Sequence, residues 1–350
     1  MTTKIPIIID TDPGIDDAMA IFYALASPEL DVVGLTTVFG NAHVDVCTDN
    51  AIRILDIAGR ADVPVARGAA RPLAMQYRGP ADYVHGVNGL ADVAVPLPSR
   101  APHALAAAHF IIEQVMAAPG EITLVPIGPL TNIALAMLLQ PDLPQHLAGM
   151  VIMGGNAFVP GNASPAAEAN ILNDPEAADI VFGADCPIVM CGLDVTERTI
   201  MSSEQIAGIA SIDNDRARLA AQILPYYRDF HLSHGGPDGI HVHDSTCISY
   251  LLAPQHYRAV HHPVRVDCGQ HVGRGKTWPT TRHALAEGPW GGRRAITSPS
   301  GIRTRAPSSP RSMRLQWWRW NSRALQSPDV CMSSSTTSSP TPRASTPTPT

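Results

Sequence analysis

Four aspartates within eight residues form the densest group of potential catalytic or metal-ligating side chains in the sequence. The segment DTDPGIDD contains Asp10, Asp12, Asp16 and Asp17, and it follows the apolar run at residues 5–9. Several carboxylates in one crevice cost several kcal/mol per unpaired ion, far more than the roughly 0.3–1 kcal/mol that a helix N-terminus returns. A bound cation would offset this repulsion, and a ligand set made only of oxygens favours calcium or magnesium over zinc.

Three other interpretations of this segment can be weighed. An EF-hand loop beginning at Asp10 needs glycine at position 6 and glutamate at position 12, but the sequence has isoleucine at both, so this interpretation fails. A phosphatase resembling the haloacid dehalogenase type would have Thr or Val in place of Gly14. Ordinary helix capping by Asp12, with Asp16 and Asp17 as solvated acids, would need no ligand.

Short apolar runs alternate with helical segments along the first 200 residues. We expect strands at 5–9, 31–38, 121–127, 149–153 and 187–191, and helices at 15–26, 44–58, 130–140 and 175–183. This alternation is typical of an α/β domain with an open, mainly parallel sheet flanked by helices. Polar residues follow the strands, among them Asn41, Gly128 and Asp194. Because ligands bind outside the carboxyl ends of such strands, we expect one crevice to collect them.

The acidic segment resembles the signature of the nucleoside hydrolase family, the inosine-uridine-preferring N-ribohydrolases. The family signature is DxDxGxDDA, and residues 10–18 are DTDPGIDDA. Other segments resemble the family in the same order, namely VFGN (38–41), VPIGPLTNIALA (125–136), MGGNAFVPGNASPAAEAN (153–170), NDPEAADIVF (173–182) and HVHDSTCISYLLAP (241–254). The resemblance extends to about residue 278. It implies a Rossmann-like core with the site at the carboxyl ends of the strands.

The resemblance implies a role for each matching residue around one calcium ion. The implied calcium ligands are the carboxylates of Asp12, Asp17 and Asp244 and the backbone carbonyl of Ile127. Asp12 is also implied as the general base for the attacking water. His243, beside the metal aspartate, is implied as the acid that protonates the leaving group.

The same resemblance implies residues that contact the substrate. The residues implied for the ribose side are Asp16, Asn41, Asn162, Glu168 and Asn170. His85 lies in HGVNGL, which resembles the family's flap, although Asn88 replaces the usual acid. Tyr227 falls where the family's base-contacting helix lies, together with Tyr226 and His231. On the residues alone, these three are equally compatible with a place in the core.

The implied function is calcium-dependent hydrolysis of ribonucleosides to ribose and a free base, in nucleoside salvage. Ionised carboxylates near the sugar suit this chemistry because cleavage of the N-glycosidic bond builds positive charge on the ribose ring. The resemblance also implies a homodimer or homotetramer. A nucleoside-binding protein with little or no catalysis is the alternative, and the release of ribose separates the two. The sequence does not choose between purine and pyrimidine bases.

The composition indicates a globular protein. The chain has 350 residues, of which 45% are hydrophobic and 16% charged, and this excludes a wholly disordered, collagen-like or coiled-coil chain. No apolar run approaches about 18 residues, and carboxylates follow the first run at once, so we expect neither a membrane span nor a signal peptide. Six cysteines without a CxxC motif suggest no disulfide framework and no zinc site, and we expect a cytoplasmic location.

Residues 279–350 differ in composition from residues 1–278, which we predict to be a catalytic domain with an incomplete C-terminus. The later segment has ten arginines against two acids, and its last part is rich in Ser, Thr and Pro. We interpret it as the product of a frameshift near codons 278–280, and we expect it to be disordered because it lacks apolar periodicity. A nucleic-acid-binding tail would instead follow a complete domain, so we expect no nucleic-acid partner. Residues 264–278 are expected to form a strand pair.

Overall fold

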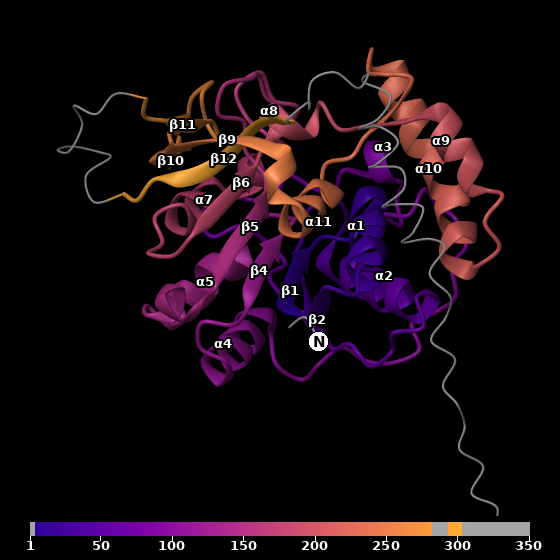
Figure 1. The fold of residues 1–350 in the computed structure, drawn as a ribbon, viewed down its shortest axis with the longest axis horizontal. Helices are drawn as coiled ribbons and strands as arrows, with labels where there is room; N and C mark the ends of the chain where they lie inside the picture. The colour runs from indigo at the N-terminus through magenta and orange to yellow at the C-terminus, as the bar shows by residue number, and fades with distance from the viewer. Residues whose placement is uncertain (1–3, 282–292, 303–350) are drawn as a thin grey trace, which may run out of the picture.

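The central feature of the protein is an eight-stranded sheet between two layers of helices (Figure 1). The computed structural model describes residues 4–281 and 293–302. The strands of this sheet are β1 (Ile5–Thr11), β2 (Leu30–Thr37), β3 (Val65–Arg67), β4 (Thr123–Pro126), β5 (Gly149–Met153), β6 (Ile188–Cys191), β9 (Tyr257–His262) and β12 (Ile296–Ile302). Their order is β3-β2-β1-β4-β5-β6-β12-β9, and all neighbours are parallel except β12 and β9. The predicted open, mainly parallel sheet is confirmed.

The helices lie on both faces of this sheet. In chain order they are α1 (Ile15–Leu25), α2 (Val44–Ile57), α3 (Asp82–His85), α4 (Ala107–Ala117), α5 (Thr131–Leu139), α6 (Ala169–Asn173), α7 (Pro175–Val181), α8 (Leu193–Thr196), α9 (Ser203–Ile209), α10 (Asp215–Ser233) and α11 (Ser245–Leu252), with short 3₁₀ turns at Leu143–His146 and Pro254–His256. Figure 1 shows α4, α5 and α7 on one side of the sheet and α1, α2 and α11 on the other. The strands and helices expected from the sequence all occur, and their ends lie within two residues of the expected positions.

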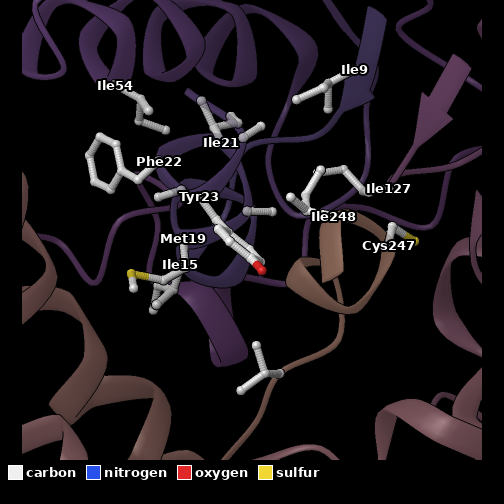
Figure 2. Close-up of a cluster of buried hydrophobic side chains, with 14 of the residues drawn as sticks. Ile9, Ile15, Met19, Ile21, Phe22, Tyr23, Ile54, Ile127, Cys247 and Ile248 are labelled. Carbon is white, nitrogen blue, oxygen red and sulfur yellow. The ribbon is translucent and has the colours of Figure 1, made fainter. Parts of the chain in front are cut away.

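The core follows from the alternation of side chains along the buried strands. In β1, Ile7 and Ile9 belong to the apolar cluster under α1, α2 and α11, whereas Ile8 belongs to the cluster under α4, α5 and α7. Figure 2 shows part of the first cluster, which includes Ile9 of β1, Phe22 of α1, Ile54 of α2 and Ile248 of α11. Because both faces of the sheet are buried, the strand ends are held rigidly, and so are the loops that leave them.

Two small antiparallel ladders lie outside the central sheet. The first pairs β10 (Val264–Val266) with β11 (Thr277–Pro279), so the strand pair expected within residues 264–278 is present. The second pairs β7 (Ile200–Ser202) with β8 (Gly239–His241). This second ladder was not expected from the sequence, and it carries the chain into the segment that contains His243 and Asp244. Among the described residues, no helix combines the length and apolar character needed to cross a membrane.

Strand β12 differs from the disordered tail that we expected after Trp278. It lies inside the central sheet, parallel to β6 and antiparallel to β9. The alternation along this strand buries Ile296 and Ser298, which are 2% and 4% exposed, and pairing with two neighbours satisfies its backbone. Ion pairs of Arg293 with Asp179 hold the start of this segment. The frameshift and the domain boundary at residue 278 stay predictions, and most of the segment lies outside the described residues.

Candidate active site

The site lies where the strand order reverses between β1 and β4. In doubly wound sheets, ligands bind outside the carboxyl ends of the strands at this switch point. Asp10 ends opposite Pro126 in the parallel register, and the Ile127 amide donates a hydrogen bond of 2.7 Å to the Asp10 carbonyl. Asp12 follows directly after β1. The first acidic residues and the Ile127 carbonyl therefore leave the sheet side by side.

Asn41, in the loop that follows β2, links two of the aspartates. Its backbone amide donates to Asp12 Oδ2 over 2.8 Å, and its side-chain amide donates to Asp17 Oδ2 over 2.9 Å. Asp17 also accepts hydrogen bonds from the Thr11 hydroxyl at 2.5 Å and from the Gly14 amide at 2.9 Å. The loop is thus closed on itself by hydrogen bonds to carboxylate oxygens. Asn41 acts here by orienting carboxylates.

Three carboxylates from two distant parts of the chain come together at this site. Oxygens of Asp16, Asp17 and Asp244 all lie within 4.8 Å of one another. Asp244 immediately precedes α11 and is 3% exposed, while the other two are in the first turn of α1. Asp12 is not one of the three, but its Oδ1 is buried and has no hydrogen-bond donor among the described residues. We call Asp12, Asp16, Asp17 and Asp244 the acid cluster.

Burial dominates the electrostatics of the acid cluster. It raises the pKa of Asp16 to about 7, and the neighbouring charge of Asp17 adds to the effect. The pKa of Asp244 is raised well above its ordinary value by burial and by the charges of Asp16, Asp17 and Asp12. Burial and the Asp17 charge raise the pKa of Asp12 in the same direction. Because the residues supply only oxygens, the donor set fits a hard divalent cation.

Asp10 supports this cluster from behind. Its Oδ1 accepts hydrogen bonds from the Thr36 hydroxyl at 2.5 Å and from the Asn132 side-chain amide at 2.8 Å. Burial raises the pKa of Asp10 to about 7. Asn132 also donates to the Thr37 carbonyl, so it ties β1 to the end of β2. Asn132 was not singled out from the sequence, although its position at the start of the helix after β4 was a usable signal.

The residues predicted to bind ribose lie in different surroundings. Glu168 precedes α6, and its carboxylate accepts hydrogen bonds from the backbone amides of Gly155, Asn170 and Ile171. The side-chain amide of Asn170 donates to the Ile127 carbonyl over 2.9 Å. Asn162 is exposed, and its Oδ1 accepts from the Ala169 amide. The structure therefore brings Asn170 to the end of β4, whereas Asn162 supports the loop before α6 from the solvent side.

Asp194, which follows β6, holds a neighbouring loop. Its carboxylate accepts hydrogen bonds from the amides of Ala157 at 2.7 Å and Phe158 at 2.8 Å. The Asn156 side-chain amide donates to the Ala166 carbonyl, 2.9 Å away. Asp194 thus positions the segment between β5 and Glu168. Its place after a strand, noted in the sequence, is explained by this anchoring.

A row of aromatic rings adjoins the acid cluster. Tyr227 of α10 stacks on His85 with ring centroids 5.5 Å apart and lies edge-on to His231 at 4.4 Å. The row continues through His241, which lies 5.2 Å from His231 and 5.7 Å from His243. The Tyr227 hydroxyl donates to Asp16 Oδ2 over 3.4 Å, so the two groups of residues touch. We call His85, His231, His241 and His243 the imidazole cluster.

Burial lowers the pKa of each histidine in the imidazole cluster and so favours the neutral ring. Burial lowers the pKa of His85 to about 3 and that of His241 to about 4. The pKa of His243 is lowered well below 6.5 by burial and by the neighbouring His241. Nδ1 of His85 accepts a hydrogen bond from the Ile15 amide at 3.2 Å. His241 was not singled out from the sequence, although the alternation in HVHD places it on the same face as His243.

Asn88 organises the loop that carries His85. Its Oδ1 accepts hydrogen bonds from the amides of Leu90 and Asp92, and its Nδ2 donates to the Val93 carbonyl. The Asp92 backbone has a φ of 56°, in the left-handed region, so these bonds hold a strained turn. The asparagine that departs from the family pattern therefore has a structural role.

The doubly wound sheet and its carboxylate-lined switch point define an α/β enzyme of the kind that binds a small molecule at the strand ends. Residues 7–304 match the family model described as inosine-uridine preferring nucleoside hydrolase. The chain therefore belongs to this family of N-glycosidases, which hydrolyse ribonucleosides. The match continues past residue 278, where the sequence resemblance was expected to end, and it includes β12.

Related proteins and solved structures agree with the family match. A probable uridine nucleosidase 2 from Arabidopsis thaliana is 45% identical over 71% of this chain and 77% of its own length. A pyrimidine-specific ribonucleoside hydrolase RihA from Shewanella oneidensis is 45% identical over 73% of this chain and 80% of its own. The plant nucleoside hydrolase PpNRh1 superposes with a TM-score of 0.85 at 34% identity, covering 92% of this chain and 99% of its own. A purine-preferring ribonucleoside hydrolase from Gardnerella vaginalis gives 0.81 at 28% identity, with 91% and 99% covered.

Proposed function

We propose that this protein is a calcium-dependent ribonucleoside hydrolase that releases ribose and a free base in nucleoside salvage. The observation that carries the proposal is the convergence of Asp16 and Asp17 with Asp244 at the switch point. Without a cation, the ionised carboxylates would carry a large free-energy cost, because they are buried and repel one another. The same two effects raise the pKa of Asp16 and Asp244. The proposed cytoplasmic location and homo-oligomeric state rest on the family resemblance.

Calcium would be held by Asp12, Asp17, Asp244 and the Ile127 carbonyl. Asp12 offers an oxygen with no donor among the described residues, and Asp17 is fixed by three donors. The Ile127 carbonyl accepts a hydrogen bond from the side-chain amide of Asn170. A metal bound to this carbonyl would therefore share it with the asparagine proposed to bind ribose. A bound cation supplies positive charge that makes a water at the site easier to deprotonate.

Asp12 is proposed to take the proton from the attacking water. A general base must be within hydrogen-bond reach of that proton, and Asp12 Oδ1 is buried without a competing donor in the part of the chain that the structure describes. Its other oxygen is fixed by the Asn41 amide, which leaves Oδ1 with a defined direction.

The ribose is proposed to be bound by Asp16, Glu168 and Asn170, with Asn41 orienting the carboxylates and the exposed Asn162 holding the loop before α6. Carboxylate charge beside the ring stabilises the positive charge that develops at C1′ during cleavage. Glu168 is held by three backbone amides, so it would present a fixed acceptor edge. Binding to both ribose hydroxyls would position C1′ against the attacking water.

The base is proposed to lie against the aromatic row. His85 and Tyr227 would contact its face, and His243 would act as the acid toward the leaving base. The aromatic row favours an aromatic ligand such as a nucleobase, because aromatic rings prefer to pack in stacked or edge-on arrangements. Since related proteins are named for uridine or pyrimidine and others for purine substrates, both kinds of base belong in the test.

Ribose release from purified full-length protein tests the proposal. Uridine, cytidine, inosine and adenosine would each be incubated with the protein and calcium, and the product measured in a reducing-sugar assay. We expect ribose from at least one of the four. Binding of a nucleoside without ribose release would instead support the nucleoside-binding alternative.

A further inference from the structure

A buried hydrogen bond joins His243 to a threonine that the proposed chemistry does not use. Thr196 Oγ1 and His243 Nδ1 are 2.9 Å apart. Thr196 is fully buried and His243 is 9% exposed, so water does not compete freely for either group. The inference below rests on the proposed function, because it concerns the leaving-group acid of that reaction.

The backbone fixes this contact from both sides. Thr196 is the last residue of α8, which follows β6 directly, and the Val195 carbonyl accepts a hydrogen bond from the Thr199 hydroxyl. The Val242 amide donates to the Thr199 carbonyl over 2.8 Å, beside the pairing of β7 with β8. These hydrogen bonds hold the two segments in register and so keep the Thr196 hydroxyl beside the His243 ring.

The direction of this hydrogen bond decides what the other ring nitrogen can do. A neutral imidazole carries a single N–H, so the partner of one ring nitrogen determines which nitrogen bears the proton. If that proton is on Nδ1, then Nε2 is an acceptor and offers no proton to a departing base. If the Thr196 hydroxyl donates to Nδ1, the proton lies on Nε2, where it can be donated.

We propose that Thr196 is a positioning residue that donates its hydroxyl proton to Nδ1 of His243 and so holds the Nε2–H tautomer toward the leaving base. The histidine then acts as a hydrogen-bond donor to the base as the C1′–N bond breaks. The bonding electrons go to the base nitrogen, and the donated hydrogen stabilises the charge that develops on the base. The hydroxyl itself touches no reacting atom.

Two substitutions and a matched control separate this role from simple packing. Thr196→Val keeps the shape and removes the hydroxyl, whereas Thr196→Ser keeps the hydroxyl and removes a methyl group. Thr199→Val removes another buried hydroxyl from the same segment, but that hydroxyl donates to a backbone carbonyl. Each variant would be assayed with uridine and with 4-nitrophenyl β-D-riboside, whose leaving group departs without a proton donor.

We expect Thr196→Val to lower kcat on uridine at least about tenfold, with KM and the nitrophenyl riboside rate changed less than about twofold. Thr196→Ser should stay within about threefold of the wild type on both substrates, and so should Thr199→Val. In a His243→Ala background, Thr196→Val should cause no further loss on uridine, because the two residues act as one unit.

Equal losses on both substrates would overturn the inference, since they would indicate a packing defect. So would an unchanged uridine rate in Thr196→Val, or an additive loss in the His243→Ala background. Failure of the proposed function is distinguishable, because the wild-type protein would then release ribose from neither substrate. Wild-type activity on both substrates with an insensitive Thr196→Val variant would overturn only the role of the threonine.

Discussion

The acid cluster and the imidazole cluster are adjacent, yet burial changes them in opposite directions. Burial raises the pKa of Asp16 to about 7, and it lowers the pKa of His85 to about 3. In both cases the low-dielectric interior penalises the charged form. We propose that a cation offsets the mutual repulsion of the carboxylates in the acid cluster. The lowered pKa values of the imidazoles favour their neutral form.

In the proposed reaction, this difference would assign its two halves to different physical effects. The acid cluster would concentrate negative charge where positive charge develops on the sugar. The imidazole cluster would supply neutral rings and directional N–H donors where the base departs. Tyr227 joins the two, because its ring stacks on His85 and its hydroxyl donates to Asp16.

Removing a carboxylate from the acid cluster should abolish catalysis. We expect Asp17→Ala or Asp244→Ala to lower kcat/KM for ribose release by about 1,000-fold or more and to eliminate calcium binding in calorimetry. Asp12→Asn should reduce turnover more than calcium affinity, because it keeps the shape but loses the base. Asp62→Ala, an exposed carboxylate paired with Arg60, is the control. Full activity in Asp17→Ala would show that the acid cluster does not hold a metal needed for catalysis.

The sugar hydroxyls should matter almost as much as the metal ligands. If Asp16 and Asn170 bind the ribose hydroxyls, 2′-deoxyuridine should be cleaved at least about 1,000-fold more slowly than uridine, since buried acceptors would lose their partners. The two substrates differ only in the 2′-hydroxyl, so uridine is the control for 2′-deoxyuridine. Comparable rates would mean that the acid cluster does not face the sugar.

The loop that carries His85 should control substrate binding more than turnover. Asn88→Ala removes three hydrogen bonds from the turn that follows His85, and we expect KM for the preferred nucleoside to rise about tenfold. Asn88→Asp keeps the acceptor oxygen and should lie close to the wild type. An unchanged KM in Asn88→Ala would show that this side of the imidazole cluster does not contact the base.

The neutral imidazoles should make the protein sensitive to acid. His85 has a folded pKa of about 3 against an ordinary value of 6.5, so the unfolded state binds more protons, and stability falls as the pH drops from 6.5 toward 3. At pH 5 this single group accounts for up to about 2 kcal/mol. His85→Gln should reduce the loss of unfolding free energy between pH 7 and pH 5, measured with urea. His109→Gln, on the exposed face of α4, should not. Equal pH dependence in both variants would contradict the assignment of His85.

The acid cluster could be predicted from the sequence because most of it is local. Three of its carboxylates occur in one loop between a strand and a helix that periodicity identifies, and the resemblance supplied Asp244. The imidazole cluster was harder to predict because His231 lies in α10, which contains Pro225, and His241 ends the three-residue strand β8. Neither element has a clear apolar period, so packing against α1 and β7 decides their positions.

Strand β12 was also difficult to predict from the sequence. ITSPSGI contains a proline and two serines, and its local propensity for a strand is weak. Its pairing with β6 and β9 and the burial of Ile296 override that propensity. Exposure of Asn162 could not be foreseen either, because the motif that contains it fixes its order in the sequence but not the direction of its side chain.

Removal and return of calcium tests the central claim most directly. Purified full-length protein would be treated exhaustively with a chelator, its residual metal measured by mass spectrometry, and ribose release from the preferred nucleoside followed before and after calcium is added. The account predicts loss of activity in the metal-free protein and recovery with calcium at about one ion per chain. Full ribose release by protein shown to contain no metal would contradict it.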